Sequence, residues 1–223
     1  MYLIELSNYS IAALGSGNGL NNFYFALSDG DACAVNTDTI DDAHVFLKTL
    51  ATIVRPESGT FRYKGKVIDF SDYRNLLFFK RKIGYIGQDS AMISNRTIRE
   101  NLLLKRSFFQ NSLSLTLDQN VVRFCKIFKI YEKLDLRPGD LRPVELRMAV
   151  AIRELTKSFD VLLLERPEDY FGHNRFDLFN EILKDTLAHG NAVVFFSHDQ
   201  DFIESFSNRK ILISGGTLVK VPA

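Results

Sequence analysis

The sequence predicts an α/β protein with a mainly parallel sheet, and three apolar segments of strand length carry that prediction. Residues 161–164 (VLLL) and 192–196 (AVVFF) are continuous apolar runs, and an amphipathic helical pattern, residues 176–187, separates them. Residues 32–35 form a third run, and a helical pattern follows it up to Pro56. Short apolar strands that alternate with helices are typical of parallel sheets buried on both faces.

The N-terminal part predicts short strands joined by turns. Residues 2–6 form an apolar run that predicts an edge strand, and residues 23–27 alternate as a hairpin strand does. Gly15 to Gly19 (GSGNG) predicts a flexible turn between them. Residues 60–67 (TFRYKGKV) predict a strand, a turn at Gly65 and a second strand.

The middle of the chain is predicted to be helical. Residues 97–105 (TIRENLLLK) open with Thr97 and Glu100, which have the spacing of a capping box. Residues 117–131 are amphipathic, and residues 143–155 begin with a proline. Because no strand pattern interrupts these helices, we expect an inserted helical subdomain over residues 89–158, with residues 1–88 and 159–223 as the core.

Three shorter patterns complete the predicted core. Residues 82–87 (KIGYIG) predict a buried strand, and residues 203–206 belong to a helix. Residues 210–213 and 217–221 flank Gly215-Gly216 and predict a closing hairpin.

Composition indicates a globular protein and excludes several functional classes. Of 223 residues, 46% are apolar and 25% charged, and the net charge of +1 offers no reason to expect nucleic acid as a partner. Two cysteines imply no disulfide framework, which agrees with a reducing compartment. No segment approaches ~18 uninterrupted apolar residues, and the first residues lack the basic start of a signal peptide. We therefore expect a cytoplasmic protein.

Residues 30–59 have the strand, turn and helix layout of a phosphate-binding loop. A working loop uses glycines to expose backbone N–H groups, a lysine to neutralise the phosphates and a hydroxyl to bind Mg²⁺. The turn here, residues 37–44 (TDTIDDAH), has no glycine and no lysine and carries three aspartates. The layout of a nucleotide site is present without its usual chemistry.

The order of these segments resembles the ATP-binding-cassette (ABC) ATPase subunits of transporters over the full length of the chain. The resemblance implies an ABC-type nucleotide-binding domain, with a RecA-like, mainly parallel core sheet, an N-terminal antiparallel β part and the inserted helical subdomain. The segments that carry it correspond to the phosphate loop, the Q-loop with its TIREN helix, the signature motif, the Walker B strand, the switch-histidine loop and the closing strands: residues 30–59, 81–101, 141–155, 161–167, 196–199 and 208–216.

Matching the phosphate loop to the family's motif implies that every phosphate-binding group is replaced. The degenerate positions are Thr37, Asp38, Thr39, Ile40, Asp41, Asp42, Ala43 and His44. The glycine positions hold Thr37, Ile40 and Asp42, the lysine position Ala43 and the hydroxyl position His44. Like charges about 4 Å apart repel by about 4 kcal/mol at an effective dielectric constant near 20, which opposes triphosphate binding.

We interpret the aspartates as helix caps that occupy the place of the phosphates, at the positive end of the helix dipole. The alternative is a cation or a non-phosphate ligand held by the aspartates and His44, and we assign no metal site.

Glu165 and Arg166 stand where the Walker B strand of the resembled family ends in Asp and Glu. Glu165 can still bind a cation, but Arg166 cannot act as a base, because a guanidinium does not deprotonate in proteins. We expect Arg166 to form an internal ion pair with Asp41 or Asp42.

The signature positions have also changed. They hold Leu141, Arg142, Pro143, Val144 and Glu145. Pro143 removes an N–H, and the side chains of Arg142 and Val144 block close approach to a γ-phosphate. We therefore predict that this segment only packs against the rest of the protein.

Two family positions keep their residues, Gln88 of the Q-loop and His198 of the switch loop. Tyr9 is out of register with the adenine-stacking aromatic, and Ala13 is the better match. We assign no confident catalytic residue; the family positions are Glu165, Arg166, His198 and Gln88.

The resemblance therefore implies a transport-complex subunit that does not hydrolyse ATP in the usual way and docks on a membrane permease through the segment from Gln88 to Asn101. It would be peripheral to the inner or plasma membrane and form a homodimer or pair with an ABC ATPase paralogue. Two alternatives remain open: an ATPase that still binds MgATP through Glu165 and His198, with Lys48 or Arg166 as its cation, and a free-standing regulator with another ligand.

Overall fold

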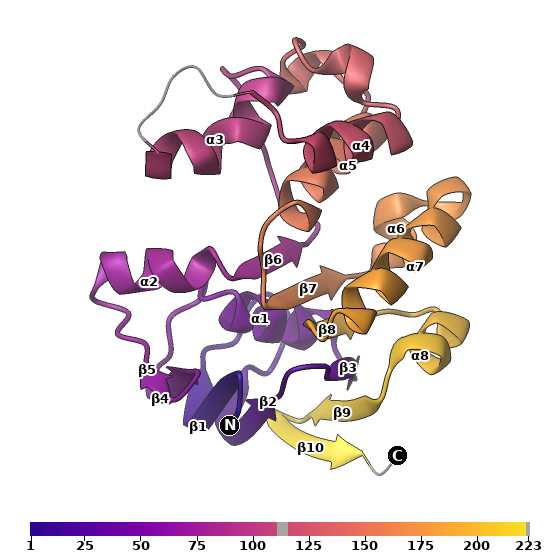
Figure 1. Ribbon diagram of the computed structural model, residues 1–223. Coiled ribbons are helices and arrows are strands. Elements are labelled where there is room, and N and C mark those ends of the chain that lie inside the picture. The colour runs from indigo at the N-terminus through magenta and orange to yellow at the C-terminus, as the bar shows by residue number, and fades with distance from the viewer. Residues whose placement is uncertain (111–115, 222–223) are drawn as a thin grey trace.

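The computed structural model describes residues 1–110 and 116–221 and contains two sheets with α1 (Ile40–Leu50) between them (Figure 1). One is a four-stranded antiparallel sheet in the order β2-β1-β4-β5. Its strands are β1 (Ile4–Ile11), β2 (Leu20–Leu27), β4 (Ser58–Tyr63) and β5 (Lys66–Val67). The predicted turn at residues 15–19 joins β1 to β2.

The second sheet has six strands in the order β10-β9-β3-β8-β7-β6. They are β3 (Ala32–Thr37), β6 (Ile83–Ile86), β7 (Val161–Glu165), β8 (Ala192–Phe196), β9 (Arg209–Ser214) and β10 (Thr217–Val221). All neighbours are parallel except β9 and β10, which form the predicted closing hairpin. The α/β prediction with a mainly parallel core sheet is confirmed, and the apolar run of residues 32–35 is a central strand.

Helices cover both faces of the parallel sheet (Figure 1). Besides α1 they are α2 (Tyr73–Lys80), α3 (Ile98–Gln110), α4 (Gln119–Ile127), α5 (Pro143–Leu155), α6 (Pro167–Phe171), α7 (His173–Ala188) and α8 (Gln200–Phe206), with short 3₁₀ turns at Tyr131–Lys133 and Pro138–Asp140. The capping box at α3 is confirmed: Thr97 N donates to Glu100 Oε2 at 2.7 Å, and Glu100 N donates to Thr97 Oγ1 at 3.2 Å.

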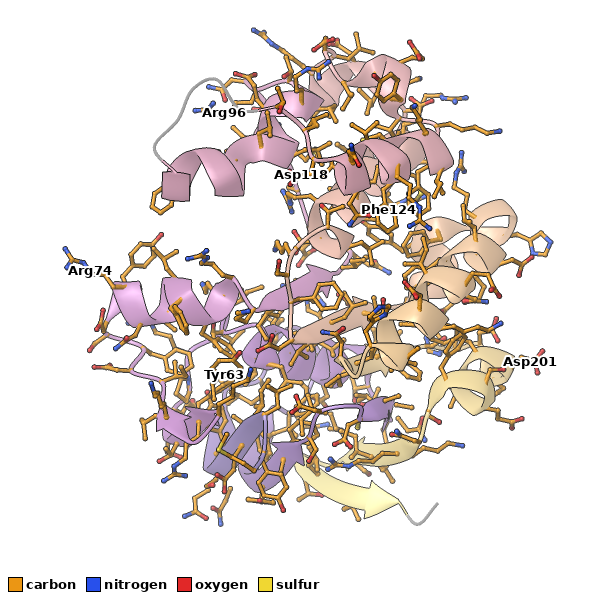
Figure 2. All side chains as sticks on the ribbon, in the orientation of Figure 1. Tyr63, Arg74, Arg96, Asp118, Phe124 and Asp201 are labelled. Carbon is orange, nitrogen blue, oxygen red and sulfur yellow. The ribbon has the colours of Figure 1, made fainter. Side chains whose placement is uncertain are left out.

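Figure 1 shows α3, α4 and α5 gathered beyond the β6 edge of the parallel sheet. In Figure 2, Phe124 of α4 lies among these helices, where it is 9% exposed, and Asp201 of α8 points outward. Buried residues of the helices form one cluster with side chains of the sheet, including Ala34, Leu162 and Phe195. The division into a core and a helical subdomain at residues 89–158 stays a prediction.

Two sequence predictions need correction. β1 is not an edge strand, because it lies between β2 and β4 and pairs with both. Helices α2 and α6 were not predicted. α2 buries only Leu76 and Phe79 and leaves Tyr73 and Phe78 more than 60% exposed, so its sequence has little amphipathic pattern.

The core has two layers separated by the parallel sheet. Cys33 and Val35 of β3 face α1 and the antiparallel sheet, whereas Ala34 faces the helices on the other side, as the twofold period of a strand requires. Phe46 of α1 is fully buried and meets Phe25 edge to face, with ring centroids 5.1 Å apart. This packing fixes α1 against both sheets. Among the described residues, no helix combines the length and apolarity needed to cross a membrane.

We predict that Phe46→Ala lowers the free energy of unfolding by about 3–5 kcal/mol, because it leaves a cavity between α1 and β2. Phe78→Ala, at a side chain that is 62% exposed, is the matched control and should change stability by no more than about 0.5 kcal/mol. Urea denaturation followed by circular dichroism measures both. Equal losses in the two variants would contradict the layered core.

Candidate functional site

The candidate site lies where the carboxyl ends of β3, β7 and β8 meet, which is where parallel α/β sheets place ligands. β3 ends at Thr37 and α1 begins at Ile40, so the expected phosphate loop is the connection between them. Glu165 is the last residue of β7, and Ser197 and His198 follow β8. The structure therefore brings the expected phosphate-loop, Walker B and switch positions to one edge.

Asp41 and Asp42 bind the loop at residues 15–19. Asp41 Oδ2 accepts from Ser16 N at 2.7 Å and from Ser16 Oγ at 2.8 Å. Asp42 Oδ1 accepts from Asn18 N at 2.8 Å and Gly19 N at 3.1 Å, and its other oxygen accepts from Asn18 Nδ2 at 3.3 Å. Asp42 is only 1% exposed. The two hydrogen bonds from Ser16, and chiefly the one from its backbone N–H, keep the pKa of the Asp41 carboxyl below its usual value.

The interpretation of the aspartates as helix caps is therefore wrong, because their carboxylates do not bind the N–H groups at the start of α1. Thr39 is the N-cap residue of α1 and makes no side-chain capping bond. Asp41 and Asp42 lie in the first turn, as the dipole argument requires, but their oxygens accept from another loop. Asp38 lies before the helix and accepts from Ser214 Oγ in the β9–β10 turn.

The other residues of the turn, Thr37, Thr39, Ile40 and Ala43, bond locally, pack in the core or face solvent. Thr37 Oγ1 donates to the Thr39 carbonyl at 2.8 Å, and Ile40 is 47% exposed. Ala43, at the expected lysine position, is fully buried. Among the described residues, no Lys or Arg forms an ion pair with Asp38, Asp41 or Asp42.

His44 connects the end of β7 to the segment after β6. Its Nδ1 lies 2.5 Å from Glu165 Oε1, and its Nε2 lies 3.3 Å from Asp89 Oδ2. Each ring nitrogen of His44 thus faces a carboxylate oxygen, so the imidazole links Glu165 to Asp89. Lys48 Nζ also binds Asp89 Oδ2, at 2.6 Å, and this bond is the largest cause that lowers the pKa of Asp89.

Glu165 has further partners on its second oxygen. Tyr85 Oη donates to Glu165 Oε2 at 3.1 Å, and Gln88 N donates to the same atom at 3.4 Å. Burial, followed by the charge of Glu165, raises the pKa of Tyr85, so the phenol stays a donor. Gln88 itself has an exposed side chain. The Glu165 side chain is buried, at 3% exposed, and both of its carboxylate oxygens have partners within this chain.

Arg166 does not form the expected ion pair with Asp41 or Asp42. Its guanidinium binds Asp169, one turn along α6. Arg166 has φ of 48°, in the left-handed region that non-glycine residues seldom adopt. Its Nε is buried and has no hydrogen-bond partner in the described part of the chain. Arg166 thus shapes the start of α6 rather than the phosphate loop.

Glu168 of α6 holds the switch loop. Its two oxygens accept from Ser197 Oγ at 2.7 Å and from the backbone N–H of His198 at 2.9 Å. The ring of His198 packs edge to face on Phe196, with centroids 4.9 Å apart, and its side chain is exposed. The contacts of His198 are those of a structural residue.

The expected signature positions form the start of α5. Arg142 is the N-cap residue, Pro143 is the first helical residue, and Leu141 and Val144 pack beside them. The Glu145 carboxylate accepts from Arg142 N at 3.1 Å and also binds the Arg142 guanidinium. Lys133 Nζ lies 2.7 Å from Glu145 Oε1. The Arg142 and Lys133 hydrogen bonds lower the pKa of Glu145 from 4.5 to about 2.

Neither residue considered for adenine stacking forms a platform. Tyr9 is fully buried between Phe23 and Phe61, and its hydroxyl has no partner in the described part of the chain. Ala13 is exposed. Within residues 1–110 and 116–221, no group of three or more His, Cys, Asp or Glu side chains is arranged to hold a metal ion.

Sequence reasoning missed Ser16, Asn18, Asp89 and Glu168, which supply partners to the site. The glycines on either side of Ser16 and Asn18 were the available signal, but they indicated only flexibility. Asp89 directly follows the Q-loop glutamine, and Glu168 lies three residues after the Walker B strand.

This fold is that of the ATP-binding cassettes. The chain superposes on the ABC transporter cassette MJ0796 with a TM-score of 0.81 over 99% of both chains, at 18% identity. It superposes on CbiO1 from Clostridium perfringens, part of the transporter complex CbiONQ, with a TM-score of 0.71 at 17% identity, over 98% of this chain and 87% of that one.

Sequence comparison points to the same class. The chain is 23% identical over 220 residues to the xylose import ATP-binding proteins XylG of Shigella flexneri and of Escherichia coli K12, which is 96% of this chain and 42% of theirs. It thus spans less than half the length of the curated relatives it matches. No family model matches the sequence. Fold and sequence together confirm the resemblance to ABC transporter ATP-binding subunits.

We predict that Glu145→Gln unfolds more easily than the wild type, and that this difference in free energy of unfolding, the stability gap, is largest near neutral pH and becomes smaller in acid. A carboxylate whose folded pKa is depressed stabilises the fold fully above its usual pKa, here 4.5, and loses that contribution as the pH falls toward about 2. Thermal unfolding across this pH range measures the gap. Glu181→Gln, at a 69% exposed carboxylate that binds one lysine, is the control. A gap that stays constant down to the lowest pH would refute the Glu145 pairing.

Proposed function

We propose that the chain is an ATP-binding-cassette subunit of a membrane transport complex that does not hydrolyse ATP in the usual way and acts as a structural or regulatory component. One observation carries the proposal: His44 lies between Glu165 and Asp89. At this place a working site has a hydroxyl, a carboxylate and Mg²⁺. The His44 imidazole fills this place and bonds the carboxylate that would otherwise bind a cation.

MgATP is poorly suited to the residues present. Asp41 and Asp42 place two negative charges in the first turn of α1, where their oxygens bind the loop at residues 15–19, and Ala43 provides no cation. At an effective dielectric constant near 20, each carboxylate about 4 Å from a phosphate charge opposes binding by about 4 kcal/mol. Millimolar affinity corresponds to only about 4.1 kcal/mol in total. One such repulsion is enough to cancel it.

The contacts disfavour ATP hydrolysis by non-standard residues. Lys48, the nearest basic residue along α1, is bound to Asp89, and Arg166 is bound to Asp169. Glu165 has no oxygen free for a cation, because His44, Tyr85 and Gln88 bind both. The carboxylate and both basic residues that this alternative needs already have partners.

A partner surface is available next to the segment from Gln88 to Asn101. A cleft of about 360 Å³ lies between the end of α1, α2, β6 and α5. Its charged lining consists of Lys48, Lys80, Arg153, Lys157, Asp89 and Glu154. Ile53, which is 52% exposed, adds apolar surface. Three of the four cations already form ion pairs within this lining, Lys48 with Asp89 and both Arg153 and Lys157 with Glu154. The apolar part of the cleft therefore suits an apolar segment of a membrane permease, which would hold the chain peripherally at the membrane.

The start of α5 also bears on dimerisation. In the family, one subunit's phosphate loop faces the other subunit's signature motif. The Glu145–Arg142 pair and Pro143 occupy the signature positions here, so a dimer with an active paralogue would have both composite sites altered. A homodimer or a heterodimer of this kind would be structural. The MJ0796 cassette has been solved as a dimer.

We predict that the chain shows no saturable binding of ATP at millimolar nucleotide and Mg²⁺, and no phosphate release. Isothermal titration calorimetry and a phosphate assay measure the two quantities. The MJ0796 cassette, solved with bound ADP and phosphate, is the positive control. Saturable binding with turnover would overturn the proposal in favour of the non-standard ATPase. Failure to co-purify with any permease, with nucleotide binding also absent, would favour the free-standing regulator.

A further inference from the structure

The loop at residues 15–19 is built to bind an anion. The backbone N–H groups of Ser16, Asn18 and Gly19 converge on two carboxylates at 2.7–3.1 Å. Successive N–H groups that face one way form an anion-binding nest, and hydrogen bonds to an ionised acceptor are about twice as strong as neutral ones. The carboxylates come from this chain itself, from Asp41 and Asp42 in the first turn of α1.

The glycines of this loop are explained by the closeness of those carboxylates. A Cβ added at Gly15 would lie 2.5 Å from Asp41 Oδ2, and one added at Gly17 would lie 2.5 Å from Asp42 Oδ1. Gly17 has no positive φ, so the need for a glycine there comes from the Asp42 carboxylate and, at 3.1 Å, from the Leu14 carbonyl oxygen. The loop is therefore shaped to its carboxylates and is not simply flexible.

A third segment closes the arrangement. Ser214 Oγ, in the β9–β10 turn, donates to Asp38, and Asp38 N donates to the Ile213 carbonyl at 3.3 Å. Asn21 N, just after the glycine loop, donates to the Gly216 carbonyl at 2.9 Å. The glycine loop thus binds the first turn of α1, while the end of β9 and the turn after it bind Asp38, before α1, and Asn21, at the start of β2. No ligand is needed to join them.

We propose that the carboxylates of Asp41 and Asp42 act as a built-in ligand that locks the glycine loop of the antiparallel sheet onto α1. The lock holds the antiparallel sheet in one position relative to the parallel sheet, with or without nucleotide. The lock goes beyond the proposed function, since it concerns the free chain and exists before any nucleotide or permease is met.

Hydrogen exchange of the free full-length chain tests the lock. We expect the amides of residues 16–19 to be protected in the wild type and to exchange about tenfold faster in Asp41→Asn, Ser16→Ala and Gly17→Ala, since each variant weakens one charge-assisted bond or forces the loop away. Asp41 is half-buried and Ser16 is exposed, so Asp41→Asn and Ser16→Ala should fold.

Two variants serve as matched controls. Asp69→Asn removes a carboxylate that accepts from Ser71 N at 2.8 Å and Ser71 Oγ at 2.7 Å, which is the same chemistry within a single turn. Gly139→Ala adds a Cβ that meets nothing within 4 Å. Both should leave the exchange of residues 16–19 unchanged.

Unprotected amides in the wild type, or equal exchange in the three lock variants and the controls, would overturn the proposal. Nucleotide is absent from these measurements. A failure of the lock is thus separate from a failure of the proposed function, which shows itself as ATP binding by the wild type.

Discussion

The first turn of α1 is polar and lies between two sheets, and the rest of the site depends on how this constraint is met. Buried polar groups need hydrogen-bond partners, because leaving one unpaired costs about 1–3 kcal/mol. Asp42 and Glu165 are at most 3% exposed, and each has several donors within hydrogen-bond distance. These donors come from the β1–β2 loop, from α1 and from the segment around Gln88. The turn is therefore one of the places at which the two sheets are joined.

This arrangement reverses the chemistry of a phosphate loop. A phosphate loop places glycines before the helix and receives the anion from outside. In this chain the anions, Asp41 and Asp42, belong to the helix, and the glycines belong to a loop more than 20 residues earlier. The ring of His44 likewise fills the space between Glu165 and Asp89 with a side chain of α1. In the function that we propose, internal contacts of this kind take the place of the nucleotide contacts.

The fold was predictable where the sequence pattern has one physical explanation. β3, β7 and β8 are buried on both faces, so they appear as unbroken apolar runs whose neighbours are helices. The position of β1 within its sheet was not predictable, because its own residues do not specify which strands pair with it. α2 was not predicted because two of its five apolar side chains, Tyr73 and Phe78, are exposed.

The site was predictable only in part, for a similar reason. The unusual residues of the turn were visible, but their partners lie far away in sequence, and Ser16 is 25 residues from Asp41. The partner of Arg166 was local: Asp169 follows three residues later at the start of a helix, a spacing that favours ion pairs. A crystal structure of the chain grown with Mg²⁺ and a non-hydrolysable ATP analogue tests the central claim most directly. We expect His44 Nδ1 to remain bonded to Glu165 with no nucleotide at residues 37–44. A triphosphate in that turn, with His44 displaced from Glu165, would contradict the account.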